Sequence, residues 1–321
     1  MSILASAMFV LTVPGGTPQQ ASQDGGQSLV RLSLIVSDPS GHSIDTVRKE
    51  EIRLLENGVP QSISVLSRDE RPIHYGIAID RSGSVRRVLQ SEIDAAKAII
   101  KNNRPGDQTF LESFVTSEKI ETHQDFTANE ASLIDGLDEL FAEMGQSAVT
   151  DAVYLAVEHI AKHQQGNDER REALVLITDG DDRDNFYKHA ALEKLLSEKR
   201  VQIFIVGFVS EINEKITNEE KLKGHRTRDE ARALLERMAE VTGGRAFFPV
   251  NETELCQAVT EIDHDLRGQF SIAYQPADYK PGFHNVAVEI VSAPGREKRK
   301  ATTRPGYFLT LAKKTKESKS Q

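Results

Sequence analysis

Short apolar runs alternate with amphipathic stretches between residues 73 and 266, and this alternation limits the fold more than any other feature of the sequence. Four runs have the length of buried strands and lie at residues 75–79, 109–114, 173–177 and 202–208. Helical spacing of apolar residues predicts helices over residues 85–100, 153–160, 230–241 and 253–266. Apolar strands that alternate with helices are typical of a doubly wound sheet. We therefore predict an α/β domain over residues 71–267, with a mostly parallel sheet and helices on both faces.

The segments on either side of this domain have the pattern of antiparallel strands. Residues 27–70 contain Asn57-Gly58 between two strand-like runs, which is a strong signal for a hairpin turn. Residues 268–310 again form short strand-like runs between Pro and Gly turns. Neither segment has enough strands to bury a core alone. We therefore predict that the two segments pair into one small β-sandwich, with the α/β domain inserted between them.

The two ends of the chain differ from the rest. Residues 1–26 hold an apolar run of signal-peptide length and a Gly- and Gln-rich linker, although no Lys or Arg precedes the run. The alternative is a frayed apolar terminus. Residues 311–321 are polar and cationic, which predicts a disordered tail. Because the run has the length of a signal peptide, we expect a secreted, periplasmic or cell-envelope location. Because it is too short to cross a bilayer, we expect no integral membrane span.

Charge and cysteine content exclude several classes of function. The formal net charge of −9 argues against a nucleic-acid partner, because phosphate backbones are bound by clustered Lys and Arg. The single cysteine, Cys256, excludes an intrachain disulfide and a cysteine-based zinc cluster. Its place in a helical pattern predicts a small buried thiol.

Oxygen-bearing side chains follow two of the predicted strands. Asp80, Ser82 and Ser84 come directly after the run 75–79, and Asp179 comes after the run 173–177. Open α/β sheets bind their ligands at the carboxyl ends of the strands, so these side chains are expected to converge. Carboxylates and hydroxyls are hard oxygen ligands, which select a hard cation such as Mg²⁺.

Together these motifs resemble the metal-ion-dependent adhesion site of von Willebrand factor A (VWA) domains. The D-x-S-x-S phrase at 80–84 matches one family loop, and T-D-G at 178–180 matches another. A third loop of the family has the form G-G-T-x-x-x-D-A, and the corresponding phrase here is GQSAVTDA at 145–152. Register on its D-A pair places Ser147, and not Thr150, at the metal. The phrases at 56–63 and 304–308 resemble bacterial, acidobacterial-type VWA-related proteins.

The resemblance implies a Rossmann-like VWA fold and a non-enzymatic recognition or adhesion module that binds a divalent metal. Mg²⁺ is the expected ion, with Mn²⁺ or Ca²⁺ as alternatives. The partner is expected to be a protein that presents an Asp or Glu to the open coordination position. Two other functions stay open, a subunit or scaffold of an envelope enzyme complex and a structural protein with a vestigial site. The expected metal ligands are Asp80, Ser82, Ser84, Ser147 and Asp179.

Other charged side chains near these motifs lead to weaker expectations. Arg81 departs from the family pattern, and its charge would either oppose the metal or attract an acidic partner. The acidic residues at 181, 182 and 184 are expected to face solvent beside Asp179. His159 and His163 lie one helical turn apart without a third ligand, which favours a solvated helix face over a zinc site.

Overall fold

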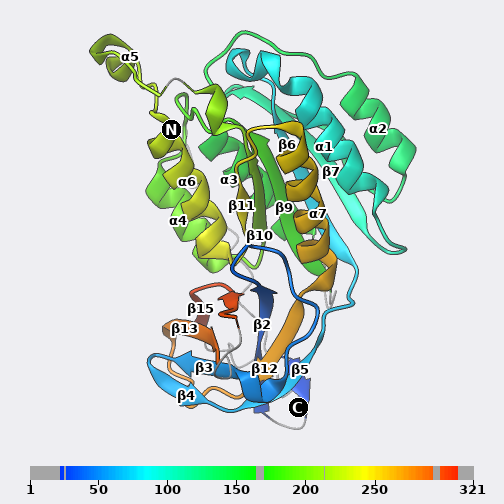
Figure 1. Ribbon diagram of the computed structural model, residues 1–321, viewed down its shortest axis with the longest axis vertical. Helices are drawn as coiled ribbons and strands as arrows, with labels where there is room; N and C mark the ends of the chain where they lie inside the picture. Colours follow the sequence, from blue (N-terminus) through cyan, green and yellow to red (C-terminus); the bar gives the residue numbers. More distant parts are fainter. Residues whose placement is uncertain (1–21, 25–26, 164–169, 213, 292–296, 310–321) are drawn as a thin grey trace, which may run out of the picture.

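A computed structural model describes residues 22–24, 27–163, 170–212, 214–291 and 297–309 of the 321-residue chain. Its α/β domain and its β-sandwich lie one beyond the other along the long axis (Figure 1). The predicted signal segment and linker lie almost entirely outside the described residues, and the predicted tail lies wholly outside them. Of the helices described, none combines the length and the apolar character needed to cross a membrane.

A six-stranded sheet forms the centre of the α/β domain. Its strand order is β11-β10-β9-β6-β7-β8, and every neighbouring pair is parallel except β7 and β8. The prediction of a mostly parallel sheet is therefore confirmed. The strands are β6 (Ile73–Asp80), β7 (Gln108–Thr116), β8 (Lys119–Thr127), β9 (Arg171–Thr178), β10 (Gln202–Gly207) and β11 (Ala246–Phe247).

Helices cover both faces of this sheet, as predicted. One face packs against α1 (Leu89–Lys101), α2 (Glu130–Asp138) and α7 (Glu252–Gly268). The other face packs against α3 (Val149–His163), α4 (His189–Glu198) and α6 (Arg228–Thr242). The short helix α5 (Asn218–Leu222) projects away from the domain (Figure 1).

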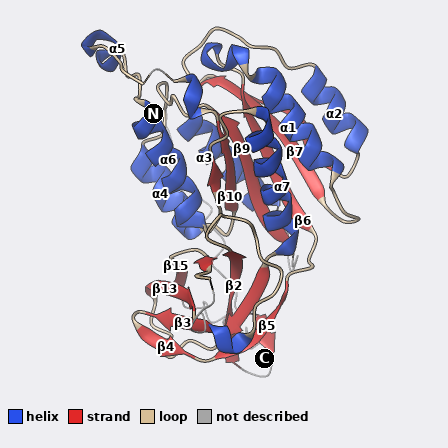
Figure 2. Ribbon diagram, in the orientation of Figure 1, coloured by secondary structure: helices blue, strands red, loops and turns tan. Residues whose placement is uncertain are grey.

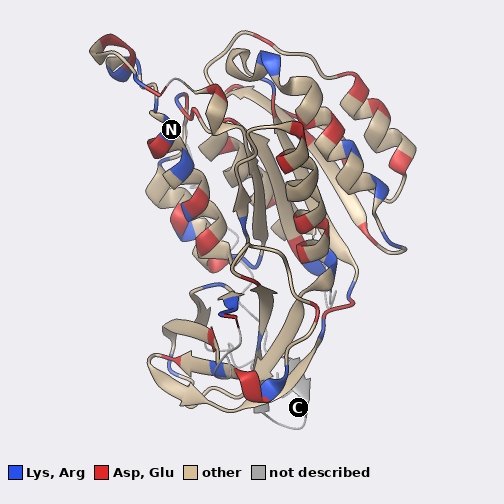
Figure 3. Cartoon of the chain, in the orientation of Figure 1, with Lys and Arg blue, Asp and Glu red and all other residues tan. Residues whose placement is uncertain are grey.

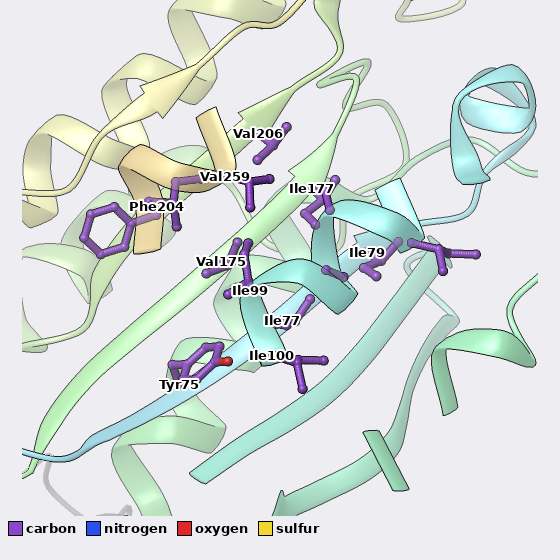
Figure 4. Close-up of a cluster of buried hydrophobic side chains, with 14 of the residues drawn as sticks. Tyr75, Ile77, Ile79, Ile99, Ile100, Val175, Ile177, Phe204, Val206 and Val259 are labelled. Atoms are coloured by element: carbon purple, nitrogen blue, oxygen red, sulfur yellow. The ribbon is translucent and has the colours of Figure 1, made fainter. Parts of the chain in front are cut away.

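Successive side chains of the buried strands point to opposite faces of the sheet, so each strand contributes to both cores. Ile77 and Ile79 of β6 lie on the face covered by α1 and α7, and Val259 of α7 lies beside Phe204 and Val206 of β10 (Figure 4). Ala78 lies on the opposite face, in the core shared with α3, α4 and α6. Because both faces of β6 are covered, all of its residues are buried, which explains its continuous apolar sequence.

The flanking segments form two antiparallel sheets, which appear below the mixed α/β domain in Figure 2. One sheet has the order β1-β2-β12-β5, with β14 also paired to β2, and the other has the order β15-β13-β3-β4. Apolar side chains from both sheets meet in one core, so the predicted β-sandwich is confirmed. The strands are β1 (Ser22–Asp24), β2 (Gln27–Ser37), β3 (Ile52–Glu56), β4 (Val59–Gln61), β5 (Ile63–Arg68), β12 (Phe270–Tyr274), β13 (Gly282–Ile290), β14 (Lys300–Thr302) and β15 (Gly306–Leu309).

The predicted hairpin turn lies between β3 and β4. Asn57 and Gly58 have φ values of 50° and 80°, the positive values that a tight hairpin turn needs at its two central residues. Glu56 pairs with Val59 across the turn.

The α/β domain joins the sandwich through two neighbouring strands. β5 leads into β6, α7 leads into β12, and β5 and β12 pair antiparallel. Polar contacts reinforce the junction, because Asp265 near the end of α7 accepts hydrogen bonds from Ser43 at 2.5 Å and from Arg245 at 2.9 Å. The guanidinium of Arg171 also donates to the Leu266 carbonyl.

The cysteine prediction is wrong. Cys256 is exposed on α7, whose buried stripe runs through Leu255, Val259 and Ile262 instead. The helical pattern was correct, but Cys256 lies one position away from the face that packs on the sheet.

Candidate metal centre

The oxygen-rich motifs meet at the carboxyl ends of β6 and β9, at the end of the α/β domain away from the sandwich (Figure 1). These two strands are neighbours, and Ile79 lies opposite Ile177 in their parallel register. The register brings Asp80 beside Thr178, whose hydroxyl donates to Asp80 Oδ2 at 2.7 Å. Adjacent strand ends therefore supply the first two polar groups of the site.

The D-x-S-x-S loop folds back over Asp80. The backbone N–H of Ser82 donates to Asp80 Oδ1 at 2.9 Å, and the Ser82 and Ser84 hydroxyl oxygens lie 3.0 Å apart. Ser84 belongs to the 3-10 turn η2 (Gly83–Arg87), which precedes α1. The loop thus places three of the predicted ligands in one small region.

Ser147 reaches the same region from the loop before α3. Its hydroxyl is buried and donates to Asp80 Oδ2 at 2.7 Å. Thr150 instead donates to Asp182 at 2.8 Å. The structure therefore brings Ser147, and not Thr150, together with Asp80, in agreement with the register used on the sequence. Metal ligation by these residues stays a prediction.

Asp179 completes the set with an unsatisfied carboxylate oxygen. The residue is only 1% exposed, and its Oδ1 accepts the Asp181 N–H at 2.9 Å, whereas its buried Oδ2 has no hydrogen-bond partner. Burial raises the pKa of Asp179 to about 7, the charge of Asp80 adds to this rise, and the Asp181 backbone and Ser84 side chain oppose it. Burial also raises the pKa of Asp80.

The donors around Asp80 are all uncharged. They are the backbone of Ser82 and the hydroxyls of Ser147 and Thr178. Two buried carboxylates thus lie close together, neither forms an ion pair with a side chain that the structure describes, and one has an unpartnered oxygen. Buried charges normally require a partner of opposite sign. Hydroxyl and carboxylate oxygens are the donors that Mg²⁺, Mn²⁺ and Ca²⁺ accept, so the residues present fit a divalent cation.

Arg81 forms local ion pairs in the structure. Its buried guanidinium turns to the side, donates from Nε to Ser113 at 2.8 Å and forms ion pairs with Glu121 and Glu143. The Glu143 N–H also donates to the Arg81 carbonyl at 2.9 Å. The charge of Arg81 is therefore neutralised locally, and the side chain fastens the first loop to the segment before Ser147.

Two of the three acidic residues after Asp179 do not face solvent, so the expectation is wrong for these two. Asp181 and Asp182 are buried. Asp181 pairs with Arg183 at 3.2 Å, and Asp182 accepts from both the backbone and the hydroxyl of Thr150. In Figure 3 the strands of the central sheet are mostly tan, while red and blue gather on helices and loops, and Asp181 and Asp182 belong to one of these loops.

The two histidines of α3 are also more enclosed than expected. His159 and His163 are half-buried and stack on Phe126 of β8, with ring centroids 5.5 Å and 4.1 Å away. His159 also lies 2.9 Å from Asp125. The prediction of a solvated helix face is therefore wrong, because this face of α3 packs on an aromatic ring.

Two groups at the site were missed on the sequence. Thr178 lies within the T-D-G motif but was given no role, although a hydroxyl directly before Asp179 at a strand end could have indicated one. Glu92 is buried in α1, where burial and the charges of Asp80 and Asp179 raise its pKa, and its sequence context gave no local signal.

Comparisons with known proteins agree with this architecture. The von Willebrand factor type A domain family matches residues 76–261. Domains of this family are in general protein-interaction and adhesion modules. No curated protein sequence matches the chain.

Several solved structures are similar to the chain. The conserved hypothetical protein BatB from Bacteroides thetaiotaomicron is 15% identical over 60% of this chain and 98% of that chain, with a TM-score of 0.44. A von Willebrand factor type A protein from Catenulispora acidiphila is 12% identical over 90% of this chain and 76% of that chain, with a TM-score of 0.48. Proximal thread matrix protein 1 from the mussel byssus is 15% identical over 66% of this chain and 51% of that chain, with a TM-score of 0.46. Since the family match spans more than half of the sequence, the chain belongs to the von Willebrand factor type A domain family.

Proposed function

We propose that this protein is a non-enzymatic, divalent-metal-dependent recognition module that binds an acidic side chain of a protein partner. The observation that carries the proposal is the meeting of two buried carboxylates and four hydroxyls at two neighbouring strand ends, without a positive side chain among the donors to Asp80. Such a site favours a cation from solution.

Several side chains of the protein would bind Mg²⁺ together. Ser82, Ser84 and Ser147 would offer hydroxyl oxygens, while Asp80 and Asp179 would supply negative charge directly or through water. When bound, the cation supplies an open coordination position that accepts one carboxylate oxygen of a partner. The chain's own contribution is positioning, because Thr178 and the Ser82 backbone fix the Asp80 carboxylate by hydrogen bonds.

Exposed apolar side chains on the same loops support a protein partner. Phe141, Met144 and Phe186 are 64%, 84% and 82% exposed. Met144 lies beside Gly83, since its sulfur is 3.7 Å from the position of a Cβ built there. Phe186 follows the segment whose backbone N–H groups donate to the Ser147 carbonyl. Apolar and aromatic side chains around a polar centre are typical of protein-binding surfaces.

The hydroxyls of the site lack the partner that a nucleophile needs. Among the described residues, no histidine hydrogen-bonds Ser82, Ser84 or Ser147, and Ser147 donates to a carboxylate that already accepts two other hydrogen bonds. A serine without an activating base is a poor nucleophile. This favours recognition over a role as an enzyme, and it leaves a place in an envelope enzyme complex as the alternative.

A thermal-unfolding titration with Mg²⁺, Mn²⁺ and Ca²⁺ tests the metal site. A cation that binds only the folded state raises the free energy of unfolding by about 2.7 kcal/mol at a hundredfold excess over its Kd. We expect this rise in the wild type and in Asp94→Ala, an exposed acid on α1, and its loss in Asp80→Ala. No rise in the wild type would leave a structural protein with a vestigial site.

The choice between two hydroxyls gives a second test. We expect Ser147→Ala to weaken Mn²⁺ binding at least about tenfold, whereas Thr150→Ala leaves the affinity within about threefold, because Thr150 is bonded to Asp182. Isothermal titration calorimetry measures both. Equal losses in the two variants would contradict the assignment of Ser147.

Carboxylate recognition is tested with a small probe and its neutral analogue. Water bound at the open position of Mn²⁺ enhances the relaxation of solvent protons, so acetate should reduce this enhancement by displacing water. Acetamide, which carries no charge, should leave it unchanged. A protein that binds Mn²⁺ but responds equally to both probes would have the metal site without the proposed recognition.

We further propose that the protein is exported, on the strength of the apolar run within residues 1–26. Expression in a bacterial host followed by separation of cytoplasm, periplasm and medium tests this. Recovery of the whole protein in the cytoplasm would contradict it.

A further inference from the structure

Glu92 is a buried carboxyl group at a position that otherwise faces the apolar core. It lies in the first turn of α1 and is 0% exposed, and neither of its carboxylate oxygens has a hydrogen-bond partner. Its neighbours one helical turn away, Leu89 and Ala96, belong to the core between α1 and the sheet. A side chain that only fills this space would be apolar.

The charges that Glu92 senses are those of the candidate metal centre. After burial, the causes that raise the pKa of Glu92 well above its usual range are the carboxylates of Asp80 and Asp179. The nearby guanidinium of Arg81 is bound to Glu121 and Glu143 and does not compensate them. Three buried carboxyl groups thus share one region, and none of them forms an ion pair with a Lys or Arg of the described chain.

The arrangement also limits how Glu92 can act. In the portion of the chain that the structure describes, no three acidic, histidine or cysteine side chains lie close enough together to ligate one ion. Glu92, Asp80 and Asp179 therefore do not form one set of carboxylate ligands around a single ion. A carboxylate just outside a ligand shell acts on the water molecules and ligands of the metal, and its removal typically weakens metal binding about 10–100-fold.

We infer that Glu92 is an outer-sphere acid of the metal centre, whose carboxylate accepts hydrogen bonds from water bound to the cation and adds a third negative charge to the site. This inference rests on the proposed function of the same site. It explains why a carboxyl group with two unpartnered oxygens occupies the face of α1 beside Asp80 and Asp179.

The chain offers a matched control for burial. Glu112 of β7 is also buried, one of its oxygens has no partner, and burial alone raises its pKa to about 8. It differs from Glu92 in that no neighbouring acid contributes to the shift. Asp94, exposed two residues beyond Glu92 on α1, controls for the loss of one negative charge.

The test measures Mn²⁺ affinity by isothermal titration calorimetry on the full chain. We expect Glu92→Gln to weaken binding about 10–100-fold, and Glu112→Gln and Asp94→Asn to change it less than about threefold. In EDTA, Glu92→Gln should melt at or above the wild-type temperature, because it removes an unpaired buried acid.

The possible results separate the two proposals. Wild-type affinity in Glu92→Gln, in a protein that binds Mn²⁺, would overturn the role of Glu92 and leave the proposed function standing. A lower melting temperature of Glu92→Gln in EDTA would show that Glu92 stabilises the fold, and would overturn the inference as well. No Mn²⁺ binding by the wild type would remove both proposals.

Discussion

The two ends of the central sheet differ in whether ion pairs neutralise their buried carboxylates. At the amino ends of the strands, which face the sandwich, Asp69 pairs with Arg71 at 2.6 Å and Asp265 pairs with Arg245 at 2.9 Å. At the carboxyl ends, Asp80, Asp179 and Glu92 have no such partner among the described side chains.

The difference shows at which end of the domain the protein's own side chains neutralise the buried carboxylates. The amino end carries its own positive charges, and the low pKa of Asp69, which persists despite burial because of Arg71, reflects this. At the carboxyl end Asp181 pairs with Arg183, but no ion pair of the described side chains neutralises Asp80 or Asp179, which costs stability in the absence of a cation. Burial is similar at both ends, so burial alone cannot distinguish a structural acid from a binding one.

The largest effect is expected when an ion pair of the amino end is broken. Arg245→Met leaves Asp265 buried without its cation and should lower the free energy of unfolding by about 3–5 kcal/mol. Urea denaturation measures this. The control Arg237→Met, which removes a surface pair with Glu193, should cost less than about 1 kcal/mol. Equal losses would mean that the amino end is not held by its ion pairs.

A pH experiment on Glu112 separates the effect of burial from that of neighbouring charge. Burial raises the pKa of Glu112 from 4.5 to about 8, so the folded state holds a proton that the unfolded state releases in this range. Stability should therefore fall as the pH rises from about 5 to about 8, by up to roughly 4 kcal/mol. Glu112→Gln should remove this component of the slope. An unchanged slope in denaturation curves would show that Glu112 already titrates normally.

A smaller effect with a change of sign is expected at the carboxyl end. Asp179→Asn removes a buried charge beside Asp80 and should stabilise the protein in EDTA by about 1–2 kcal/mol. With saturating Mg²⁺ the order should reverse, because the variant gains less from the cation. Melting curves under the two conditions measure this. If the variant were less stable than the wild type in EDTA, Asp179 would stabilise the fold. The two ends would then not differ in the role of their buried acids.

Sequence reasoning predicted the elements whose signal is local. β6 and β9 are covered on both faces, so their continuous apolar sequences were sufficient. The edge strand β8 and the short helix α2 were not predicted. β8 has no buried residue and its sequence is polar, while α2 buries only Leu133 and Leu137.

The residues of the candidate site also fall into those with a local sequence signal and those without one. The D-x-S-x-S and T-D-G phrases are contiguous, and a strand end is enough to place them. The partners of the acidic loop are not contiguous, since Asp181 accepts from the backbone of Arg226 and Asp182 from the backbone of Thr150. The position of Glu92 beside Asp80 depends on how α1 packs on the sheet, which no short motif encodes.

The paired strands β5 and β12 attach the α/β domain to the sandwich at a pair of covalent points, side by side. A single linker would act as a swivel, but a pair of neighbouring attachments resists rotation about the long axis. A pull on a partner held at the far end of the α/β domain would therefore be divided between both chain segments, and torque as well as tension would pass into the sandwich. The inserted topology would thus couple rotation of the α/β domain to rotation of the sandwich.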